Sequence, residues 1–424
     1  MLSRVVVVGS SLAALRACET LRQEGFEGEI ALVGAETEIP YDKPPLSKKV
    51  LAGEWEVERI RLRKPDDFAE LALDMHLGNG ATGLRVESRV VTLADGSDLP
   101  FDGLVIATGA IPRRLPSQPE LDGVVELRTL ANSIALRDRI ADGSARVTVI
   151  GAGFIGLEVA ATARQRGCAV TVLEAAPAPM IRGLGAAMGK AVAATHTRHG
   201  VDLRCGIAVA GIEGDGSRVT GVRLADSSLI ASDVVVVGVG VAPATHWLAD
   251  SGLKLGDGVI CDSTLQTSAP GIYAAGDCAR WPNGVFAGFD DEEMRIEHWT
   301  NAAEQGAAAA RNMLAIARGE PATPYESVPF FWSDQFDSRI QFVGRAHGDD
   351  EIHVFAGSTN LKNDANLENG KDSFAALYGY AGRLRGVLGV NLPKMVMPFR
   401  TLMAAKATWP EALERAASLS PASA

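Results

Sequence analysis

The chain has 424 residues and a formal net charge of −11 at pH 7, with 47% hydrophobic and 22% charged residues. This length is too great for one hydrophobic core, so two or three domains are expected. The negative charge argues against nucleic acid and anionic membranes as main partners, and an acidic protein partner would need a local basic patch. We find no apolar run near the ~20 residues that span a bilayer and no signal peptide, which predicts a cytoplasmic location.

The first predicted element is a buried strand formed by four consecutive valines at residues 5–8. A glycine turn at residues 9–14 follows, in which Ser11 and Ala14 stand where glycines are often found. A helix over 12–23, a strand over 30–33 and then Glu36 complete the pattern. This order predicts a dinucleotide-binding unit, and the alternative is a plain tight turn between a strand and a helix.

A proline-rich loop occupies residues 40–48. Prolines stiffen the loop, so Lys48 can hold an ammonium group beside a bound molecule, whereas the alternative is a loop with solvated lysines. The stretch from Glu54 to Lys64 contains three glutamates, at 54, 56 and 58, followed by the basic run 59–64, and it indicates a solvated face more than a docking patch. Short strands are expected over 82–106, and the last of them ends in the small-residue turn 107–110.

The strongest pattern lies between Arg146 and Glu174. A strand over 147–150 precedes the G-x-G-x-x-G run 151–156, a helix over 157–166 follows, and a second strand over 170–173 ends at Glu174. The glycines permit a tight turn, close approach of a pyrophosphate and close packing of the helix. The start of the helix attracts phosphate, and Glu174 can accept hydrogen bonds from a ribose while repelling a 2′-phosphate. We therefore predict that this unit binds NADH in preference to NADPH.

Beyond this unit, Arg182 is placed to cover the adenine or the ribose. Residues 201–232 alternate apolar and polar side chains as in a β-meander. The valine run 234–237 then enters the glycine-lined turn 238–243, which should face the nicotinamide cofactor because open α/β sheets bind ligands at the carboxyl ends of their strands.

The second informative stretch, residues 265–278, is a strand that ends in small residues. It places Asp277 at a predicted helix start, where the carboxylate can accept hydroxyl groups of a ribityl chain or can simply cap a helix. A helix rich in small residues is expected over 302–317. Strands over 339–388 and terminal helices then predict a separate C-terminal domain without a nucleotide signature.

The five cysteines show no metal-ligand spacing and no C-x-x-C motif. We therefore expect no disulfide chemistry and no metal.

Several of these motifs together resemble those of a known family. The turn 107–109 and the Gly276-Asp277 pair, combined with two dinucleotide folds, resemble the two-dinucleotide-fold flavoprotein reductases. Within that group, residues 40–48, 295–299 and 331–335 resemble the NADH-dependent ferredoxin reductases of the putidaredoxin reductase type. Those enzymes serve cytochromes P450 and Rieske-type oxygenases, and the likeness covers about residues 1–345.

The resemblance implies an α/β fold with two Rossmann-like domains, for FAD and NAD, and a C-terminal α+β domain. The implied boundaries are 1–115 with 248–325 for FAD, 116–247 for NAD and 326–424 for the C-terminal interface domain. It implies FAD contacts at Gly9, Ser11, Ala13, Glu36, Lys43, Lys48, Ala81, Thr108, Gly109, Arg128, Gly276, Asp277 and Trp299. It implies NADH contacts at Gly151, Gly153, Phe154, Ile155, Gly156, Glu158, Glu174, Arg182, Gly238 and Gly240.

By the same resemblance, Lys48 lies near flavin N5 with Glu158 as its carboxylate partner, and both are implied catalytic residues. Trp299 would lie against the flavin, and Trp332 near a 2Fe–2S ferredoxin that accepts the electrons. Ser11 and Ala14 depart from the family pattern, although serine can still donate to phosphate. The negative net charge is a second departure, because ferredoxins of this kind are acidic.

Other flavoproteins of this fold remain alternatives. Disulfide reductases place a cysteine pair, and NADH oxidases a single cysteine, where this chain has residues 43–48, so those chemistries are not expected. A reductase for rubredoxin or a small molecule shares every motif, as does a flavoprotein similar to apoptosis-inducing factor that binds partners according to its redox state. The patch that docks the ferredoxin has two candidates, the stretch 59–64 and the region of Lys394, Arg400 and Lys406.

Overall fold

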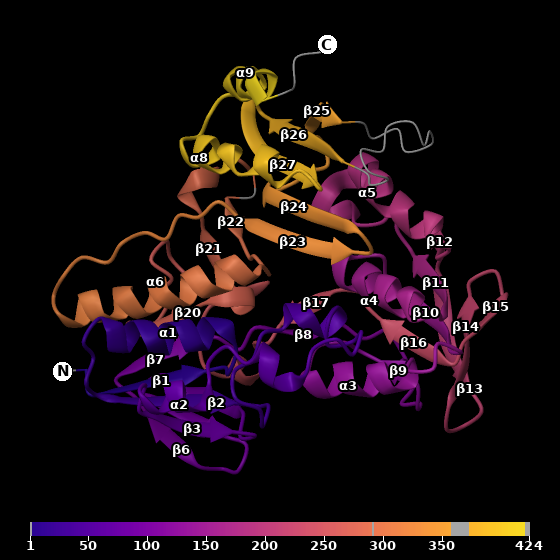
Figure 1. Ribbon diagram of the computed structural model, residues 1–424. Helices are drawn as coiled ribbons and strands as arrows, with labels where there is room; N and C mark the ends of the chain where they lie inside the picture. Colours follow the sequence, from indigo (N-terminus) through magenta and orange to yellow (C-terminus); the bar gives the residue numbers. More distant parts are fainter. Residues whose placement is uncertain (1, 291, 358–372, 420–424) are drawn as a thin grey trace. The chain divides into compact units, whose positions relative to one another are not determined.

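Figure 1 presents a computed structural model of the chain, which describes residues 2–290, 292–357 and 373–419. The chain forms two compact units. Unit 1 consists of Met1–Asp42, Glu58–Ile111 and Ala242–Pro329, and unit 2 consists of Lys43–Val57, Pro112–Val241 and Phe330–Ala424. Each unit contains a five-stranded parallel sheet with helices and a three-stranded antiparallel sheet, and unit 2 also contains the five-stranded antiparallel sheet of the C-terminal region. The predicted α/β class with two Rossmann-like sheets and a C-terminal α+β region is confirmed.

Unit 1 is built on a parallel sheet with the strand order β20-β7-β1-β2-β3. Its strands are β1 (Arg4–Val8), β2 (Glu29–Gly34), β3 (Leu73–Leu77), β7 (Gly103–Ile106) and β20 (Ile272–Ala274). The valines of β1 are at most 2% exposed, as expected for a central strand covered on both faces. Helix α1 (Leu12–Gln23) has the predicted bounds, and α6 (Trp299–Ala317) begins three residues before the predicted helix and runs beside α1 (Figure 1).

The remaining elements of unit 1 are short. Of the expected strands over 82–106, the last is β7 of the parallel sheet, and the others form an antiparallel sheet of β4 (Ala81–Arg85), β5 (Val90–Leu93) and β6 (Asp98–Pro100). A further sheet contains β18 (Leu255–Gly256), β19 (Gly258–Ile260), β21 (Ala279–Pro282) and β22 (Glu293–Met294). The helical pieces are α2 (Pro65–Ala69), η3 (His246–Leu248), η4 (Gly276–Cys278) and η5 (Gly284–Phe286). Three further elements span the sequence boundaries of the two units: η2 (Val57–Ile60), β8 (Ala110–Pro112) and β17 (Val241–Pro243).

One local prediction in unit 1 was wrong. Asp277 does not start an α-helix, because η4 is a single 3₁₀ turn that leads directly into strand β21. Residues 279–280 pair with β19, so the backbone after Asp277 continues as a strand and not as a helix.

The nucleotide half of unit 2 is a parallel sheet in the order β12-β11-β10-β16-β9. Its strands are β9 (Val124–Val125), β10 (Arg146–Ile150), β11 (Ala169–Glu174), β12 (Asp202–Cys205) and β16 (Val234–Val237). The helices are α3 (Leu130–Arg139), α4 (Phe154–Gln165) and α5 (Ile181–Arg198), with the 3₁₀ turn η1 (Pro44–Ser47). Helix α4 begins three residues earlier than predicted, because Gly153 is its extended N-cap.

The predicted meander is shorter than expected. Residues 202–205 form β12, which pairs in parallel with β11 at the sheet edge. Only β13 (Val209–Gly214), β14 (Val219–Leu224) and β15 (Leu229–Ala231) form the antiparallel meander.

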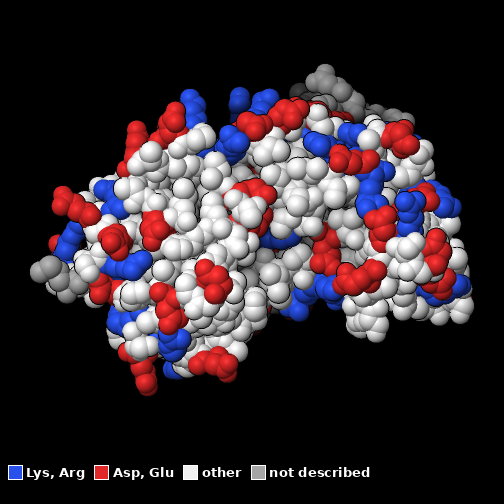
Figure 2. Space-filling view, turned by 90° about the horizontal axis from the view of Figure 1, so that it is seen from below, with Lys and Arg blue, Asp and Glu red and all other residues white. Residues whose placement is uncertain are grey.

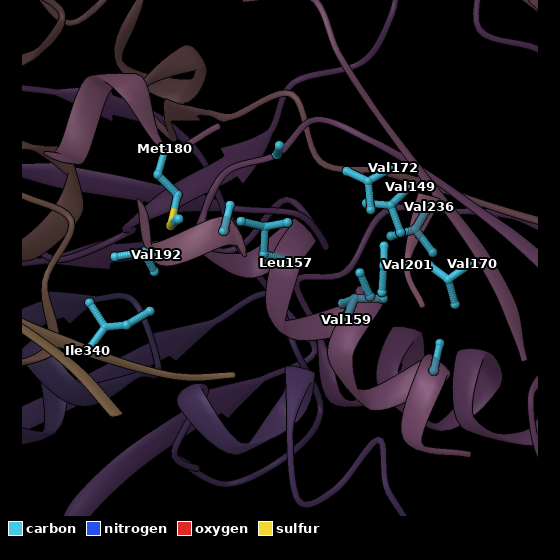
Figure 3. Close-up of a cluster of buried hydrophobic side chains, with 14 of the residues drawn as sticks. Val149, Leu157, Val159, Val170, Val172, Met180, Val192, Val201, Val236 and Ile340 are labelled. Atoms are coloured by element: carbon cyan, nitrogen blue, oxygen red, sulfur yellow. The ribbon is translucent and has the colours of Figure 1, made fainter. Parts of the chain in front are cut away.

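The core of unit 2 joins the nucleotide sheet to the C-terminal sheet. Figure 3 shows Val149, Val172 and Val236 from three neighbouring strands beside Val159 of α4 and Val201. The same cluster includes Ile340, Phe342, Phe374 and Tyr378 of the C-terminal region. These two regions of unit 2 therefore share one hydrophobic core and gain stability from the same burial.

The C-terminal sheet is antiparallel in the order β23-β24-β27-β26-β25. Its strands are β23 (Phe330–Gln335), β24 (Ser338–Gly344), β25 (Glu351–Gly357), β26 (Phe374–Tyr380) and β27 (Arg383–Val390), followed by α7 (Pro393–Val396), α8 (Pro398–Ala404) and α9 (Trp409–Leu419). Residues 358–372, within the predicted strand region 339–388, lie outside the described residues. In the part of the chain that the structure describes, no helix combines the length and apolar character needed to cross a membrane.

Candidate active site

The glycine turn of unit 1 has the shape of a phosphate-binding turn. Gly9 has φ +127°, and a Cβ at this position would lie 2.1 Å from the carbonyl oxygen of Ala107. Ser11 is the N-cap of α1, yet its side chain makes no capping hydrogen bond. The hydroxyl is thus not used to cap α1, and the first N–H groups of the helix form the kind of site that binds a pyrophosphate.

Replacing Gly9 by alanine should abolish FAD binding, because the added methyl group needs a disfavoured φ and overlaps the backbone of Ala107. The measurement is the flavin absorbance of the purified protein relative to its 280 nm absorbance. Gly25→Ala is the matched control, since Gly25 also has positive φ (+80°) but has nothing within 4 Å of its Cβ position. A yellow Gly9→Ala protein with full FAD content would contradict this assignment.

The other implied FAD contacts in unit 1 follow the carboxyl ends of its parallel strands, which meet at one edge of the sheet. Glu36 follows β2 and accepts a hydrogen bond from the hydroxyl of Tyr41. Thr108 and Gly109 follow β7, and Gly276 and Asp277 follow β20. The remaining implied contacts in this unit are Ala13 in the first turn of α1, Ala81 at the start of β4 and Trp299, whose Nε1 donates to Asp42 Oδ1 at 2.7 Å.

Gln305 is a polar residue of this region that the sequence reasoning missed. It is fully buried on α6, and its Oε1 accepts the N–H of Gly276 at 2.8 Å. Its Nε2 is buried and has no hydrogen-bond partner among the described residues. A buried donor of this kind fits a site whose acceptor belongs to a bound cofactor.

The glycine turn of unit 2 repeats this geometry. Gly151 has φ +106°, and its Cβ position lies 2.3 Å from the carbonyl oxygen of Gly238, so the turns after β10 and β16 touch. Nothing lies within 4 Å of the Cβ position of Gly153, so open space precedes the N-terminus of α4. Ile155, two residues after Gly153, is 47% exposed and offers an apolar contact to a ring of a bound dinucleotide. Together these features fit a dinucleotide.

Glu174 and Arg182 extend this site. Glu174 ends β11, and its two carboxylate oxygens accept the N–H groups of Ala152 at 2.7 Å and Ala176 at 2.8 Å. The carboxylate is thus fixed against the glycine turn. Arg182 is exposed on the first turn of α5, and its Nη1 lies 3.7 Å from the Cβ position of Gly240.

Lys48 and Glu158 form a nearly buried ion pair in unit 2. Lys48 Nζ donates to Glu158 Oε1 at 2.7 Å, and the two side chains are 14% and 6% exposed. The segment that carries Lys48 is fixed to this unit, because Ser133 Oγ donates to the carbonyl oxygen of Leu46 and Thr162 Oγ1 donates to that of Ser47. A charge pair held this rigidly can act electrostatically on a group bound beside it.

Two serines that the sequence reasoning missed complete this network. Ser47 Oγ donates to Glu158 Oε2, and Ser333 Oγ donates to Glu158 Oε1 at 2.6 Å. Glu158 therefore accepts hydrogen bonds from one ammonium and two hydroxyl groups, which compensates for its burial.

All five cysteines are free, and burial raises the pKa of each thiol, to about 12 for Cys18. The thiolate, the reactive form, is therefore disfavoured at neutral pH. Among the described residues, no group of three or more His, Cys, Asp and Glu is arranged to hold a metal ion.

Residues 3–306 match the family described as pyridine nucleotide-disulphide oxidoreductase, and residues 330–419 match the reductase C-terminal family. The chain is 37% identical to the rhodocoxin reductase of Rhodococcus erythropolis over 401 residues, covering 94% of this chain and 89% of the relative. It is 37% identical over 363 residues to the ferredoxin–NAD(+) reductase component of the p-cumate 2,3-dioxygenase system of Pseudomonas putida, covering 84% and 86%.

The chain belongs to the pyridine nucleotide-disulphide oxidoreductase family. Within it, the chain is a member of the ferredoxin reductase group. The structure of the covalent putidaredoxin reductase–putidaredoxin complex matches this reductase with a TM-score of 0.87 and 34% identity, over 95% of this chain and 93% of the other.

Two of the reductase's implied FAD contacts, Lys43 and Arg128, belong to unit 2 together with Lys48. Lys43 is the N-cap of η1, and Arg128 directly precedes Thr129, the N-cap of α3. Their contact with FAD stays a prediction.

The first of the two basic stretches of the reductase pairs with acidic side chains. In the run 59–64, Arg61 pairs with Glu58 at 3.2 Å, and Arg63 pairs with Glu19 at 2.8 Å and Glu70 at 3.7 Å. Figure 2 shows one face of the molecule, on which basic and acidic side chains are interspersed. In the C-terminal region, Lys394 and Lys406 are exposed. The charge of the first stretch is thus partly neutralised by its neighbours.

Proposed function

We propose that this reductase is an NADH:ferredoxin oxidoreductase that binds FAD and NADH and passes electrons to a 2Fe–2S ferredoxin serving a cytochrome P450 or a Rieske oxygenase. The observation that carries the proposal is the buried ion pair between Glu158 and Lys48, because Lys48 lies in the stretch 43–48 where disulfide reductases of this fold carry a cysteine pair. The names of the relatives support the choice of acceptor, since one is a ferredoxin–NAD(+) reductase component of a dioxygenase system. We propose the cytoplasm as its location.

We also propose a division of labour along the chain. FAD is bound by residues 1–115 and 248–325, NADH by 116–247, and the ferredoxin by 326–424. In the FAD-binding part, Ser11 and the start of α1 hold the pyrophosphate, and Glu36 and Asp277 accept hydroxyl groups. Trp299 lies against the flavin ring, oriented by its hydrogen bond to Asp42.

When bound, FAD would supply the redox chemistry, since a flavin can take two electrons as a hydride from NADH and pass them on one at a time. The chain contributes position and charge. Lys48 keeps a positive charge near the flavin, where negative charge increases on reduction. Glu158 keeps the ammonium in place, and Ser47 and Ser333 keep Glu158 in place. Gly153, Ile155 and Arg182 hold the dinucleotide from which the hydride leaves.

A ferredoxin panel tests the function directly. The purified yellow protein should be bleached by NADH and should reduce at least one 2Fe–2S ferredoxin, measured by the loss of visible ferredoxin absorbance under anaerobic conditions. An acidic ferredoxin that docks on a basic patch should be reduced more slowly as salt rises from about 50 to 500 mM, because screening shortens the range of the attraction.

The same assay discriminates among acceptors and docking patches. Rubredoxin and a small-molecule acceptor serve as the alternative acceptors, and faster reduction of either than of every ferredoxin would overturn the proposal. Charge reversal at Lys394 and at Arg59 compares the two candidate basic stretches, since only a residue within the docking patch should alter the salt dependence. Binding of a partner that depends on flavin redox state, without NADH turnover, would identify a flavoprotein of a different class.

A further inference from the structure

Helix α5 is broken after its first turn, and the separated turn carries Arg182. Met180 precedes the helix in the left-handed conformation (φ 51°), and Gly185 interrupts it with φ 73° and ψ 166°. The N–H of Met180 donates to the carbonyl oxygen of Ala152 in the nucleotide turn at 2.9 Å. Gly185 thus separates the turn 181–184 from the remainder of α5.

Tyr378 of the C-terminal sheet donates a hydrogen bond to this separated turn. Its hydroxyl donates to the carbonyl oxygen of Leu184 at 2.9 Å, across 194 residues of sequence. The side chain is fully buried in strand β26. Burial raises the pKa of the Tyr378 hydroxyl well above its ordinary value, so the group remains a protonated donor at any pH at which the protein works.

An aromatic column connects the same residue to the nucleotide-binding helix. The ring of Phe342 lies 5.1 Å from that of Tyr378, Phe331 lies 5.6 Å from Phe342, and Phe154 lies 4.7 Å from Phe331. Phe154 is the first residue of α4, whereas the other three rings come from strands β23, β24 and β26 of the C-terminal sheet (Figure 1).

The separated turn is held at both ends of this column. A Cβ at Gly183 would lie 2.6 Å from the ring of Phe154, so the backbone of the turn rests directly on that ring. At the other end, the Tyr378 hydroxyl binds Leu184. Interiors packed in this way transmit small displacements, so losing one support should shift the turn and its arginine.

We propose that Tyr378 is a positioning residue for NADH binding: its hydrogen bond to the separated turn 181–184 keeps Arg182 beside Gly240. This inference rests on the proposed function, in which Arg182 and the glycine turns bind the dinucleotide. It gives the C-terminal domain a role in NADH binding in addition to the ferredoxin contact proposed for it.

The test is Tyr378→Phe, which keeps the ring and removes only the hydroxyl group. The dissociation constant for NAD⁺, measured by calorimetry on the oxidised holoenzyme, should rise about two- to tenfold. This is the loss of affinity expected when one neutral hydrogen bond is removed. The KM for NADH should rise to a similar extent, while kcat at saturating NADH and the flavin spectrum stay unchanged. A lower melting temperature with an unchanged dissociation constant would show a merely structural role and would overturn the inference.

Tyr273→Phe is the matched control. Tyr273 is also a buried strand tyrosine, at 1% exposure, but its hydroxyl has no hydrogen-bond partner among the described residues. Its removal should leave NAD⁺ binding at the wild-type value, and an equal loss in both variants would overturn the specific role of Tyr378.

A double-mutant cycle separates this inference from the function on which it rests. If Tyr378 acts through Arg182, Tyr378→Phe should weaken NAD⁺ binding in the wild-type background and have almost no effect in the Arg182→Ala background. Additive losses would overturn the inference. Failure of the proposed function would be seen differently, since the wild-type holoenzyme would then not be reduced by NADH at all.

Discussion

Lys48→Ala should slow the reduction of the bound flavin by NADH by roughly two orders of magnitude, the usual effect of removing one preorganised electrostatic contact. The ammonium is 14% exposed and fixed by Glu158, so solvent cannot readily replace its charge. The variant should still purify with FAD, because the contacts that we propose for the pyrophosphate and the ribityl chain lie on other residues. Anaerobic stopped-flow absorbance at the flavin maximum measures the rate, and an unchanged rate would remove Lys48 from the mechanism.

Two further variants separate this effect from general destabilisation. Lys48→Ala leaves the Glu158 carboxylate buried without its cation, which costs about 3 kcal/mol of stability. The double variant Lys48→Met/Glu158→Gln removes both charges at similar volume, so it should regain much of that stability but not the rate. Lys49→Ala is the surface control, because Lys49 is 50% exposed and pairs with the exposed Glu54. Recovery of the rate in the double variant would contradict an electrostatic role.

The strands and glycine turns were predictable because their signals are local. Runs of β-branched residues that end at Gly9, Gly151 and Gly238 specify buried parallel strands followed by tight turns, and β1, β10 and β16 lie where these runs predicted. Helix α1 was predicted to the residue. The start of α4 was missed by three residues because the glycine run conceals the apolar spacing, although Gly153 is an ordinary N-cap.

The network around Glu158 was only half predictable. The pairing with Lys48 was implied by a family resemblance, whereas Ser47 and Ser333 lie in the resembling stretches 40–48 and 331–335 but were assigned no role there. They reach Glu158 across 111 and 175 residues of sequence. The alternation of a strand offered one signal for Ser333: it lies on the same face of β23 as Phe331, which contacts α4, and Gln335, whose Oε1 lies 2.8 Å from His196 Nε2 on α5.

The prediction for Asp277 failed for a related reason. A strand that ends in small residues and an aspartate precedes an α-helix or a 3₁₀ turn equally well. The choice depends on β19, which pairs with the residues after Asp277. Strand pairing between distant segments cannot be read from the local sequence pattern around Asp277.

The wild-type reductase should use NADH with a kcat/KM at least about 100-fold above that for NADPH, because a 2′-phosphate would bring two negative charges to the fixed carboxylate of Glu174. Glu174→Gln removes the charge and keeps an acceptor for one of the two backbone N–H groups that the carboxylate now binds. We expect the ratio to fall at least tenfold in this variant, chiefly through a lower KM for NADPH. Steady-state kinetics with a small electron acceptor measure both values.

Glu213→Gln is the control for the change in net charge. Glu213 lies on the meander of the same unit and pairs with Arg223 at 2.7 Å, with 40% of its side chain exposed. Its neutralisation alters the total charge equally but should leave the NADH to NADPH ratio unchanged, because screening in salt restricts the effect of an exposed charge to about 10 Å. Equal kcat/KM for the two cofactors in the wild type would refute the role of Glu174. An equal fall in both variants would indicate that overall charge, and not the carboxylate at the end of β11, sets the preference.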